Sequence, residues 1–275
     1  MFENIISPKV ADWQVTDNCN RNCTFCYGPK MGTGNLSLSQ SKFLIDKISL
    51  IGSKVLGLTG GEALLHHNIE EIILYAKYKN LAIGLNTNCD RYDRYRDIII
   101  ENVDALEIPL EYSCKAYHDK YRGSGSFDSI IRTLKDSYEN SNIFYRIGTV
   151  LFDQSIDDLL ELENLLSKFS DKIVYWKIYE YIPYTNKCLN SINSSTEKFN
   201  RLSHGAWRQG LGNLIGTDKI IFDSCQMRKH SYFLINPVGN VFLPSEENNQ
   251  PFEKYIGNLL ENDCETIVYE WRKHV

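Results

Sequence analysis

Three cysteines near the start of the chain have the residue type and spacing to bind an iron–sulfur cluster. Cys19, Cys23 and Cys26 form a C-x3-C-x2-C run, with the apolar Phe25 directly before the last thiol. Three thiolates in such a run can bind three irons of a four-iron, four-sulfur cluster and leave the fourth iron open to a small molecule. A structural zinc site is the alternative. Such sites usually take four protein ligands, often as two close C-x2-C pairs, and this sequence has no second close pair.

A glycine pair followed by an acid lies at the end of the next predicted strand. Gly60, Gly61 and Glu62 follow residues 55–59, which have the pattern of a strand. Because glycine has no Cβ, two in succession let the backbone come close to a bound ligand. Taken alone, the motif also fits a plain strand-to-helix turn. Together with the cysteine run it resembles the radical S-adenosylmethionine (radical SAM) superfamily, over about residues 11 to 182.

This resemblance implies one four-iron, four-sulfur cluster, held by the three cysteines, with SAM bound at the open iron. Reduction of the cluster would cleave SAM to a 5'-deoxyadenosyl radical, and an electron donor such as a flavodoxin or ferredoxin would supply the electron. The loop of Gly60 and Gly61, together with Glu62, would hold the ammonium group of SAM. Phe25 and Tyr27 would cover the cluster and the adenine and keep water away from the radical.

Further contacts to SAM are expected from later segments. The 121–126 segment, YRGSGS, looks like the family segment whose arginine binds the SAM carboxylate, and the planar fork of Arg122 suits a carboxylate. A solvated arginine in a glycine loop is the alternative. Glu111 is expected to bind the ribose hydroxyls, although Pro109 stands where related enzymes often have a serine. Asn86 and Asn88 are further candidates for the ribose or the substrate, with simple capping of their strand as the alternative.

Size and composition are those of an ordinary globular chain. The sequence has 275 residues, a formal net charge of −5 and eight cysteines, and 43% of its residues are hydrophobic. The mild acidity argues against a surface that coats nucleic acid and leaves small anionic substrates open. The sequence shows no signal peptide and no apolar stretch of membrane-spanning length, which predicts a cytosolic protein without a membrane partner. In that compartment the cysteines are better interpreted as ligands and free thiols than as disulfides.

Strand and helix patterns alternate through the first two thirds of the chain. Strands are expected at residues 12–16, 55–59, 82–87, 105–110, 143–151 and 173–181, and helices at 38–51, 69–79, 92–102, 127–139 and 156–169. Ser37 or Ser39 is the expected cap of the first helix. Six strands that alternate with helices in this order predict an α/β fold, a partial (β/α)6 TIM-like barrel. The loops that follow the strands then share one face, which brings the cysteines, the Gly-Gly-Glu motif and Asn86 together.

The sequence changes character near residue 182. Residues 1–182 are therefore expected to form the barrel core, and residues 183–275 a hairpin-and-helix extension that covers the barrel mouth. Within the extension a loop is expected at 183–195, helices at 196–209 and 264–273, and strands at 219–222, 232–236 and 241–243. The turn at 236–240 would join the last two strands into a hairpin.

Two basic residues on the later strands suggest a binding site for an anionic substrate. The segments around Arg146 and Lys177 resemble the fifth and sixth strands of viperin-like enzymes, in which basic residues bind the phosphates of a nucleoside triphosphate. The resemblance implies a nucleotide or a related small anionic metabolite as substrate. Tyr175 stands where an arginine is expected, so this binding site would be incomplete. The alternative is that the two cations pair with carboxylates inside the barrel, namely Glu107, Glu111 or Glu180.

The C-terminal segment also resembles the peptide-modifying branch of the superfamily. Its 236–240 turn and the Gly257–Asn258 pair match that branch, which makes a ribosomally made precursor peptide the second substrate candidate. That branch carries an added cluster, but Pro244 stands where its hairpin cysteine would be. The remaining candidate thiols, Cys188, Cys225 and Cys264, are too few and too scattered to argue for a second cluster. A non-catalytic iron–sulfur sensor is the third hypothesis, against which the Gly-Gly-Glu motif argues.

Overall fold

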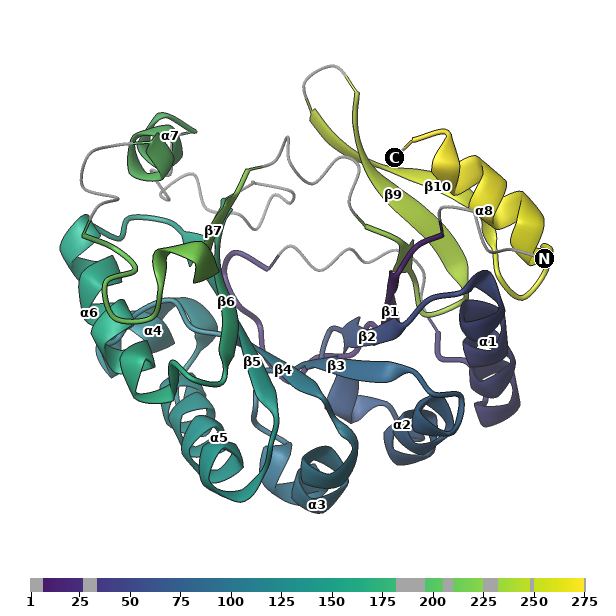
Figure 1. Ribbon diagram of the computed structural model, residues 1–275, viewed down its shortest axis with the longest axis horizontal. Coiled ribbons are helices and arrows are strands. Elements are labelled where there is room, and N and C mark those ends of the chain that lie inside the picture. Colours follow the sequence, from purple (N-terminus) through teal and green to yellow (C-terminus); the bar gives the residue numbers. More distant parts are fainter. Residues whose placement is uncertain are drawn as a thin grey trace.

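A single curved sheet organises the chain. The computed structural model describes residues 7–26, 34–181, 196–204, 210–224, 232–247 and 250–274. Their strands form one ten-stranded sheet in the order β10-β9-β8-β1-β2-β3-β4-β5-β6-β7. The strands from β1 to β7 run parallel, and the sheet bends into an open arc with the helices outside it (Figure 1). The prediction of an α/β fold with a partial TIM-like barrel is confirmed.

The predicted core strands and helices are present, with ends that differ by a few residues. The parallel strands are β1 (Val10–Thr16), β2 (Val55–Gly60), β3 (Ala82–Asn86), β4 (Ala105–Pro109), β5 (Phe144–Leu151), β6 (Ile173–Glu180) and β7 (Ile220–Asp223). The helices among them are α1 (Leu38–Ile51), α2 (Ile69–Tyr78), α3 (Tyr92–Asn102), α4 (Lys115–Arg122), α5 (Ser126–Asn140) and α6 (Ile156–Leu166). Helix α4 was not predicted, because it buries only His118 and Tyr121 and so lacks an apolar stripe.

Helix α1 shows how local chemistry fixes the ends of an element. The Ser37 hydroxyl accepts a hydrogen bond from the Gln40 backbone, and the Gln40 side chain accepts one from the Ser37 N–H. This reciprocal capping box satisfies two donors at the start of the helix. Gly52 ends the helix in the left-handed conformation, with φ at 93°. Ser37 is therefore confirmed as the cap.

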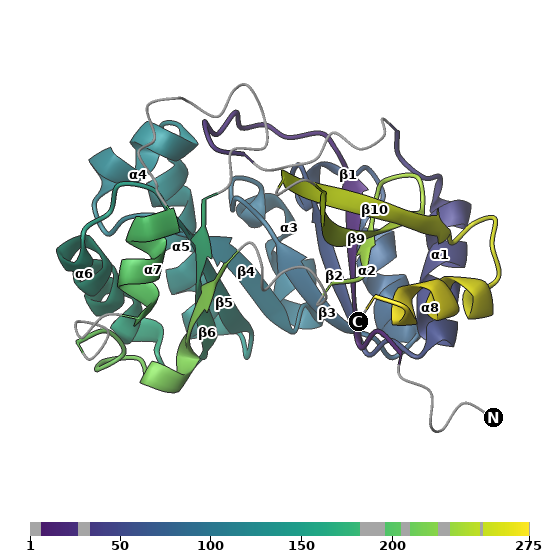
Figure 2. The ribbon, with the colours of Figure 1, turned by 90° about the horizontal axis from the view of Figure 1, so that it is seen from above.

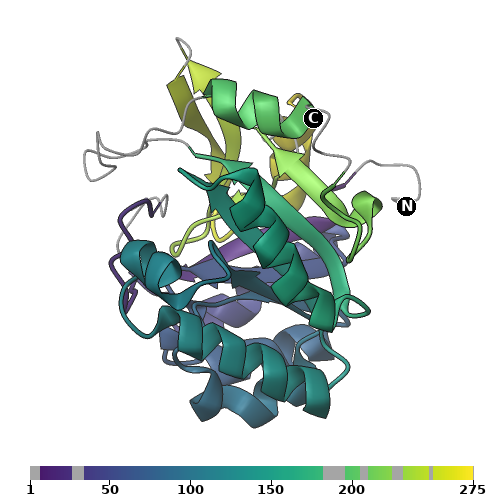
Figure 3. The ribbon, with the colours of Figure 1, turned by 90° about the vertical axis from the view of Figure 1, so that its left-hand side faces the viewer.

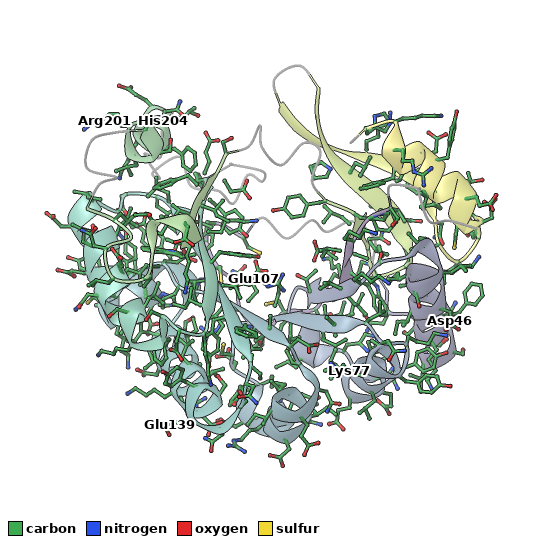
Figure 4. All side chains as sticks on the ribbon, viewed as in Figure 1. Asp46, Lys77, Glu107, Glu139, Arg201 and His204 are labelled. Carbon is green, nitrogen blue, oxygen red and sulfur yellow. The ribbon has the colours of Figure 1, made fainter. Side chains whose placement is uncertain are left out.

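The two faces of the sheet differ in chemistry. Alternate residues of the strands, such as Trp13 of β1 and Trp176 of β6, are fully buried and join the apolar core under the helices. The residues between them lie on the concave face and are only partly buried. Figure 4 shows Glu107 inside the curve of the sheet, whereas Lys77 and Glu139 lie on the outer helices. Polar groups are thus gathered on the concave side, where a substrate can be reached.

Segments after residue 182 lie at both edges of the core sheet. Strand β7 pairs parallel with β6, and β8 (Leu234–Ile235) pairs parallel with β1. The predicted hairpin is confirmed, since β9 (Asn240–Glu247) runs antiparallel to β8. Strand β10 (Gln250–Asn258) extends it antiparallel to β9 and was not predicted, because Pro251 and Gly257 interrupt any strand pattern.

Two helices accompany these edge strands. Helix α7 (Thr196–His204) forms within the predicted 196–209 segment, and α8 (Cys264–Arg272) matches the predicted last helix. Figure 2 shows α8 beside α1 and β10, and the Cys264 thiol donates to the Lys47 carbonyl of α1 at 3.7 Å. In Figure 3 the helices near the β6 side of the sheet face the viewer and cover its outer surface. The predicted 183–195 loop, Tyr27, Cys188 and Cys225 lie outside the described residues.

No helix in the described part of the chain is both long and apolar enough to cross a membrane.

Candidate active site

The three cysteines lie together in the loop that follows β1. Cys19 and Cys26 are exposed, Cys23 is half-buried, and all three are free thiols. The Cys26 N–H donates to the Cys23 carbonyl at 3.2 Å, which closes a turn between the last two thiols. Burial raises the pKa of Cys23, and the neighbouring Cys26 and Cys19 raise it further. Three free thiols on one loop are the type of donor that three corners of an iron–sulfur cluster require.

The Gly-Gly-Glu loop is joined directly to the segment that enters the cysteine loop. The Gly61 N–H donates to the Thr16 carbonyl and the Glu62 N–H to the Asn18 carbonyl, both at 2.8 Å. A Cβ on Gly60 would lie 2.3 Å from the Thr16 oxygen, and one on Gly61 would lie 2.4 Å from the Asn18 oxygen. The close approach that these glycines allow in the structure is therefore to the protein's own backbone. The motif and the cysteine loop form one unit.

Glu62 is held by the loop that follows β3. Its buried carboxylate accepts hydrogen bonds from the Thr87 hydroxyl at 2.8 Å, the Asn88 N–H at 2.6 Å and the Leu64 N–H at 3.1 Å. Burial raises the pKa of Glu62, and these hydrogen bonds oppose the rise. The Asn88 side-chain amide in turn lies 4.0 Å from the Cys19 sulfur. The ends of β1, β2 and β3 thus meet around Cys19, as the barrel topology predicts.

Arg122 and Glu111 form an ion pair with each other. Both Nε and Nη2 of Arg122 donate to Glu111 Oε1, at 2.8 and 2.6 Å, and the Val150 N–H donates to Oε2 at 2.6 Å. The Glu111 side chain is fully buried, and the Arg122 side chain is 13% exposed. Burial raises the pKa of Glu111, and the Arg122 guanidinium opposes this shift. The sequence predicts separate ligands for these residues, the SAM carboxylate for Arg122 and the ribose for Glu111, and gives no sign of their pairing.

An aromatic group lies beside the second cysteine. The Phe25 ring lies 4.5 Å from that of Phe152, and the Tyr121 ring lies 4.8 Å from Phe152. This group of rings packs against Cys23, and the Arg122 guanidinium lies 5.0 Å from the centre of the Phe25 ring. These rings place apolar surface beside Cys23, and the covering role of Phe25 stays a prediction.

Asn86, Arg146 and Lys177 lie on the concave face rather than in the cysteine loop. Asn86 ends β3 and is half-buried opposite Glu107 of β4. Arg146 Nε lies 3.8 Å from Glu107 Oε2, and Lys177 Nζ lies 3.3 Å from Asp223 Oδ2. The pairing of Arg146 with Glu107 is the alternative that the sequence left open.

Three glycines on the concave face make room for large polar side chains. A Cβ on Gly57 would lie 2.0 Å from Asp12 Oδ1, one on Gly84 would lie 2.1 Å from Arg146 Nη2, and one on Gly148 would lie 3.3 Å from the Tyr179 ring. Polar side chains therefore lie across the sheet. Sequence reasoning missed Asp12 and Asp223, which belong to this polar surface. A sequence signal was available for Asp12, because apolar and polar residues alternate along its strand, VADWQVT.

Burial and like charge act on this surface. They raise the pKa of Asp12 to about 6, with burial the larger cause and Glu107 the next, while Arg146 and Lys177 oppose the shift. The Lys177 ammonium also donates to the Tyr232 hydroxyl at 3.1 Å. Among the described residues, this surface carries three carboxylates, Asp12, Glu107 and Asp223, and two cations, Arg146 and Lys177.

Comparison with known proteins agrees with this geometry. A family model described as the radical SAM superfamily matches residues 13–166, more than half of the chain. The AdoMet-dependent heme synthase of Methanosarcina barkeri (strain Fusaro / DSM 804) is 23% identical, covering 72% of this chain and 57% of that protein. Mycofactocin maturase MftC of Mycobacterium tuberculosis (strain ATCC 25618 / H37Rv) is 26% identical, covering 59% and 43%. The chain thus spans about half the length of the curated relatives it matches.

Solved structures share the fold. Streptococcus suis SuiB bound to precursor peptide SuiA superimposes with a TM-score of 0.74 at 16% identity, over 98% of this chain and 65% of SuiB. Native anSMEcpe with bound AdoMet gives a TM-score of 0.69 at 12% identity, over 97% and 82%. At these identities the likeness shows the fold. The resemblance to viperin-like enzymes is not confirmed by these comparisons.

The family match, the sheet topology and the three free thiols lead to one conclusion. The cofactors of the family are a four-iron, four-sulfur cluster and SAM, and the thiols, the Gly-Gly-Glu loop and the aromatic shelter described above fit both. The prediction of a radical SAM enzyme is confirmed. This chain belongs to the radical SAM superfamily.

Proposed function

We propose that this chain is a radical SAM maturase that modifies a peptide. The main argument for a peptide substrate is the charge of the concave face. Among the described residues of that face, three carboxylates stand against two cations, and each cation has a carboxylate beside it. A nucleoside triphosphate would meet a net negative surface there, which disfavours its binding. A peptide segment is close to neutral along its backbone and offers both donors and acceptors to such a surface.

Some of the named relatives support a peptide substrate, and others suggest a tetrapyrrole instead. Mycofactocin maturase MftC and the subtilosin biosynthesis protein AlbA of Bacillus subtilis (strain 168) are among the relatives, and SuiB was solved with a precursor peptide. The heme synthases stand against this choice. A tetrapyrrole with several carboxylates would meet the same acidic surface as a triphosphate. The charge argument therefore favours the peptide over both anionic candidates.

In this proposal each part of the site has a distinct task. Cys19, Cys23 and Cys26 hold the cluster, which, with SAM bound, supplies a 5'-deoxyadenosyl radical that removes a hydrogen atom from the substrate. The backbone of Gly60 and Gly61, with Glu62, holds the ammonium group of SAM. Arg122 binds the SAM carboxylate through donors that its pairing with Glu111 leaves available. Glu111 orients that guanidinium, which leaves the ribose to other groups such as Asn86.

The substrate lies along the concave face in this proposal. Arg146 and Lys177 bind its carbonyl groups rather than phosphates, and Asp12 and Glu107 accept its N–H groups. Residues 1–182 act as the core, and residues 183–275 extend over the barrel mouth. A flavodoxin or ferredoxin supplies the electron.

The test follows substrate-dependent SAM cleavage. The protein is reconstituted with iron and sulfide under anaerobic conditions and reduced, and 5'-deoxyadenosine is measured with and without candidates. The candidates are synthetic peptides from short reading frames beside the gene, nucleoside triphosphates and an iron coproporphyrin, and the Cys23→Ala variant is the control. A peptide that raises deoxyadenosine formation and changes mass supports the proposal. Stimulation by the triphosphate or the porphyrin alone would overturn it.

A further inference from the structure

Arg21 lies between the first two cysteines and connects three loops. Its side chain is only 9% exposed. Its Nη1 lies within hydrogen-bond distance of the carbonyl oxygens of Arg122, Gly123 and Ser124, at 3.2, 3.1 and 3.5 Å. Its Nη2 forms an ion pair with Asp90, whose side chain is 19% exposed. We call this set of contacts the Arg21 clasp.

The Arg21 clasp joins segments that are distant in the sequence. Asp90 belongs to the loop between β3 and α3. The three carbonyls belong to Arg122, the last residue of α4, and to the turn that leads from it to α5. Asp90 also accepts a hydrogen bond from the Asn20 side chain at 2.6 Å, so two neighbouring residues of the cysteine loop hold it. Figure 2 shows the segment after β1 crossing one end of the barrel toward α4. The Thr24 N–H, which donates to the Tyr121 carbonyl at 3.2 Å, adds a backbone bond at the same junction.

Arg122 connects the Arg21 clasp to the candidate SAM site. The Arg122 carbonyl accepts a hydrogen bond from Arg21 and lies 3.8 Å from the Cys23 sulfur. The Arg122 guanidinium lies over the Phe25 ring and forms an ion pair with Glu111. One residue therefore contacts the cysteine loop through its backbone and the candidate SAM site through its side chain. A shift of the cysteine loop must move Arg122 with it.

We infer that Arg21 and Asp90 are positioning residues, which fix the cysteine loop against the turn that carries Arg122 and so set the geometry of cluster and SAM together. The inference rests on the cluster and SAM sites and not on the identity of the substrate. It assigns to two residues other than the three cysteines a role in how the cluster responds to SAM. Residues that orient metal ligands without touching the metal typically change affinity by about 10- to 100-fold when replaced.

Geometry makes lysine a poor replacement for Arg21. The guanidinium reaches the carbonyls with one nitrogen and Asp90 with the other, and its planar fork fixes the angle between these two directions. An ammonium group is a point donor on a flexible stem, so Arg21→Lys keeps the charge but loses the fixed angle. A role in positioning therefore predicts an effect of this conservative change, whereas a purely ionic role predicts none.

The test compares Arg21→Lys, Asp90→Asn and the exchange Arg21→Asp with Asp90→Arg. The matched control is Arg96→Gln, which breaks an ion pair with Asp136 that joins α3 to α5. Iron and sulfide per chain are measured after anaerobic reconstitution, together with the electron paramagnetic resonance spectrum of the reduced cluster during a SAM titration. Thermal unfolding of the cluster-free protein reports the fold.

The expected result is that Arg21→Lys and Asp90→Asn unfold cooperatively like the control, yet need about 10- to 100-fold more SAM to shift the cluster spectrum or fail to shift it. The exchange should recover part of the response, because it restores the ion pair but not the carbonyl contacts. If Asp90→Asn does not fold, Arg21→Lys decides alone. A parental SAM titration in Arg21→Lys, or an equal loss in Arg96→Gln, would overturn the inference. Since no substrate is added, the result is independent of the peptide assignment.

Discussion

Removal of the Arg122 side chain should destabilise the protein even without cluster or SAM. In Arg122→Ala, the Glu111 carboxylate loses both donors on Oε1 and keeps only the Val150 N–H on Oε2. Its side chain has no exposure to water, so solvent cannot replace the lost partners without a local opening. Removal of one partner of a buried ion pair costs about 3–5 kcal/mol, because the remaining charge is desolvated and uncompensated.

A second substitution separates this cost from lost packing. In Arg122→Met with Glu111→Gln, no buried charge remains and much of the side-chain volume is kept. Replacement of both charges is often close to neutral, so this double variant should recover most of the loss, about 2–4 kcal/mol. A double-mutant cycle completed with the single variants Arg122→Met and Glu111→Gln isolates the pair energy from the effect of each single change.

The assay is urea unfolding of the cluster-free protein at pH 7.5 under reducing conditions, followed by circular dichroism. A loss of less than about 1 kcal/mol in Arg122→Ala would refute the reasoning, because surface ion pairs contribute about that much. It would mean that Arg122 points away from Glu111 in the free protein. Arg122 could then bind the SAM carboxylate without first giving up its contacts to Glu111.

Three further predictions concern the cluster, the glycine loop and the concave face. Cys23→Ala should abolish cluster binding and SAM cleavage, and an unchanged iron content per chain would contradict this. Gly61→Ala should lower the iron content, because its Cβ would meet the backbone of Asn18 at 2.4 Å, whereas Gly148→Ala should not, and equal iron in both variants would count against the steric argument. Burial raises the pKa of Asp12 from 3.8 to about 6, so the folded state binds a proton that the unfolded chain has lost between these values. The stabilising contribution of this proton is complete below pH 4 and is lost as the pH rises through 6. From pH 4 to 7 the free energy of unfolding of the parent should therefore fall by up to about 3 kcal/mol relative to that of Asp12→Asn. If urea unfolding gives parallel pH profiles for the two proteins, the pKa of Asp12 is not raised.

Much of the barrel follows from local patterns. The boundaries of α1 and α3 match the sequence prediction, and for α1 the capping box at Ser37 and the left-handed Gly52 explain why. Helix α4 escaped prediction because its residues are mostly polar and exposed. Strand β10 escaped because its hydrogen bonds are made to β9, and pairing with a neighbour can override the local signals of Pro251 and Gly257.

In the candidate site, too, local motifs could be predicted from the sequence, whereas contacts between distant residues could not. The sequence identified the cysteine run and the Gly-Gly-Glu motif, since ligand spacing and consecutive glycines are local properties. It also named Arg122 and Glu111, but it gave each a separate ligand. The structure joins them as a pair across eleven positions of the chain and places Asp90 against Arg21 across sixty-nine.

The sequence by itself therefore determined the chemistry that this protein can carry: three thiolates, a Gly-Gly-Glu loop expected to approach a ligand, and alternating elements that must build a parallel sheet. Only the tertiary structure decided how charges are distributed around that chemistry. Sequence periodicity shows that Asp12, Arg146 and Lys177 can share the concave face, but not which carboxylate each cation meets. That choice depends on strand register and on the space above Gly57 and Gly84, which arise only when distant strands lie side by side.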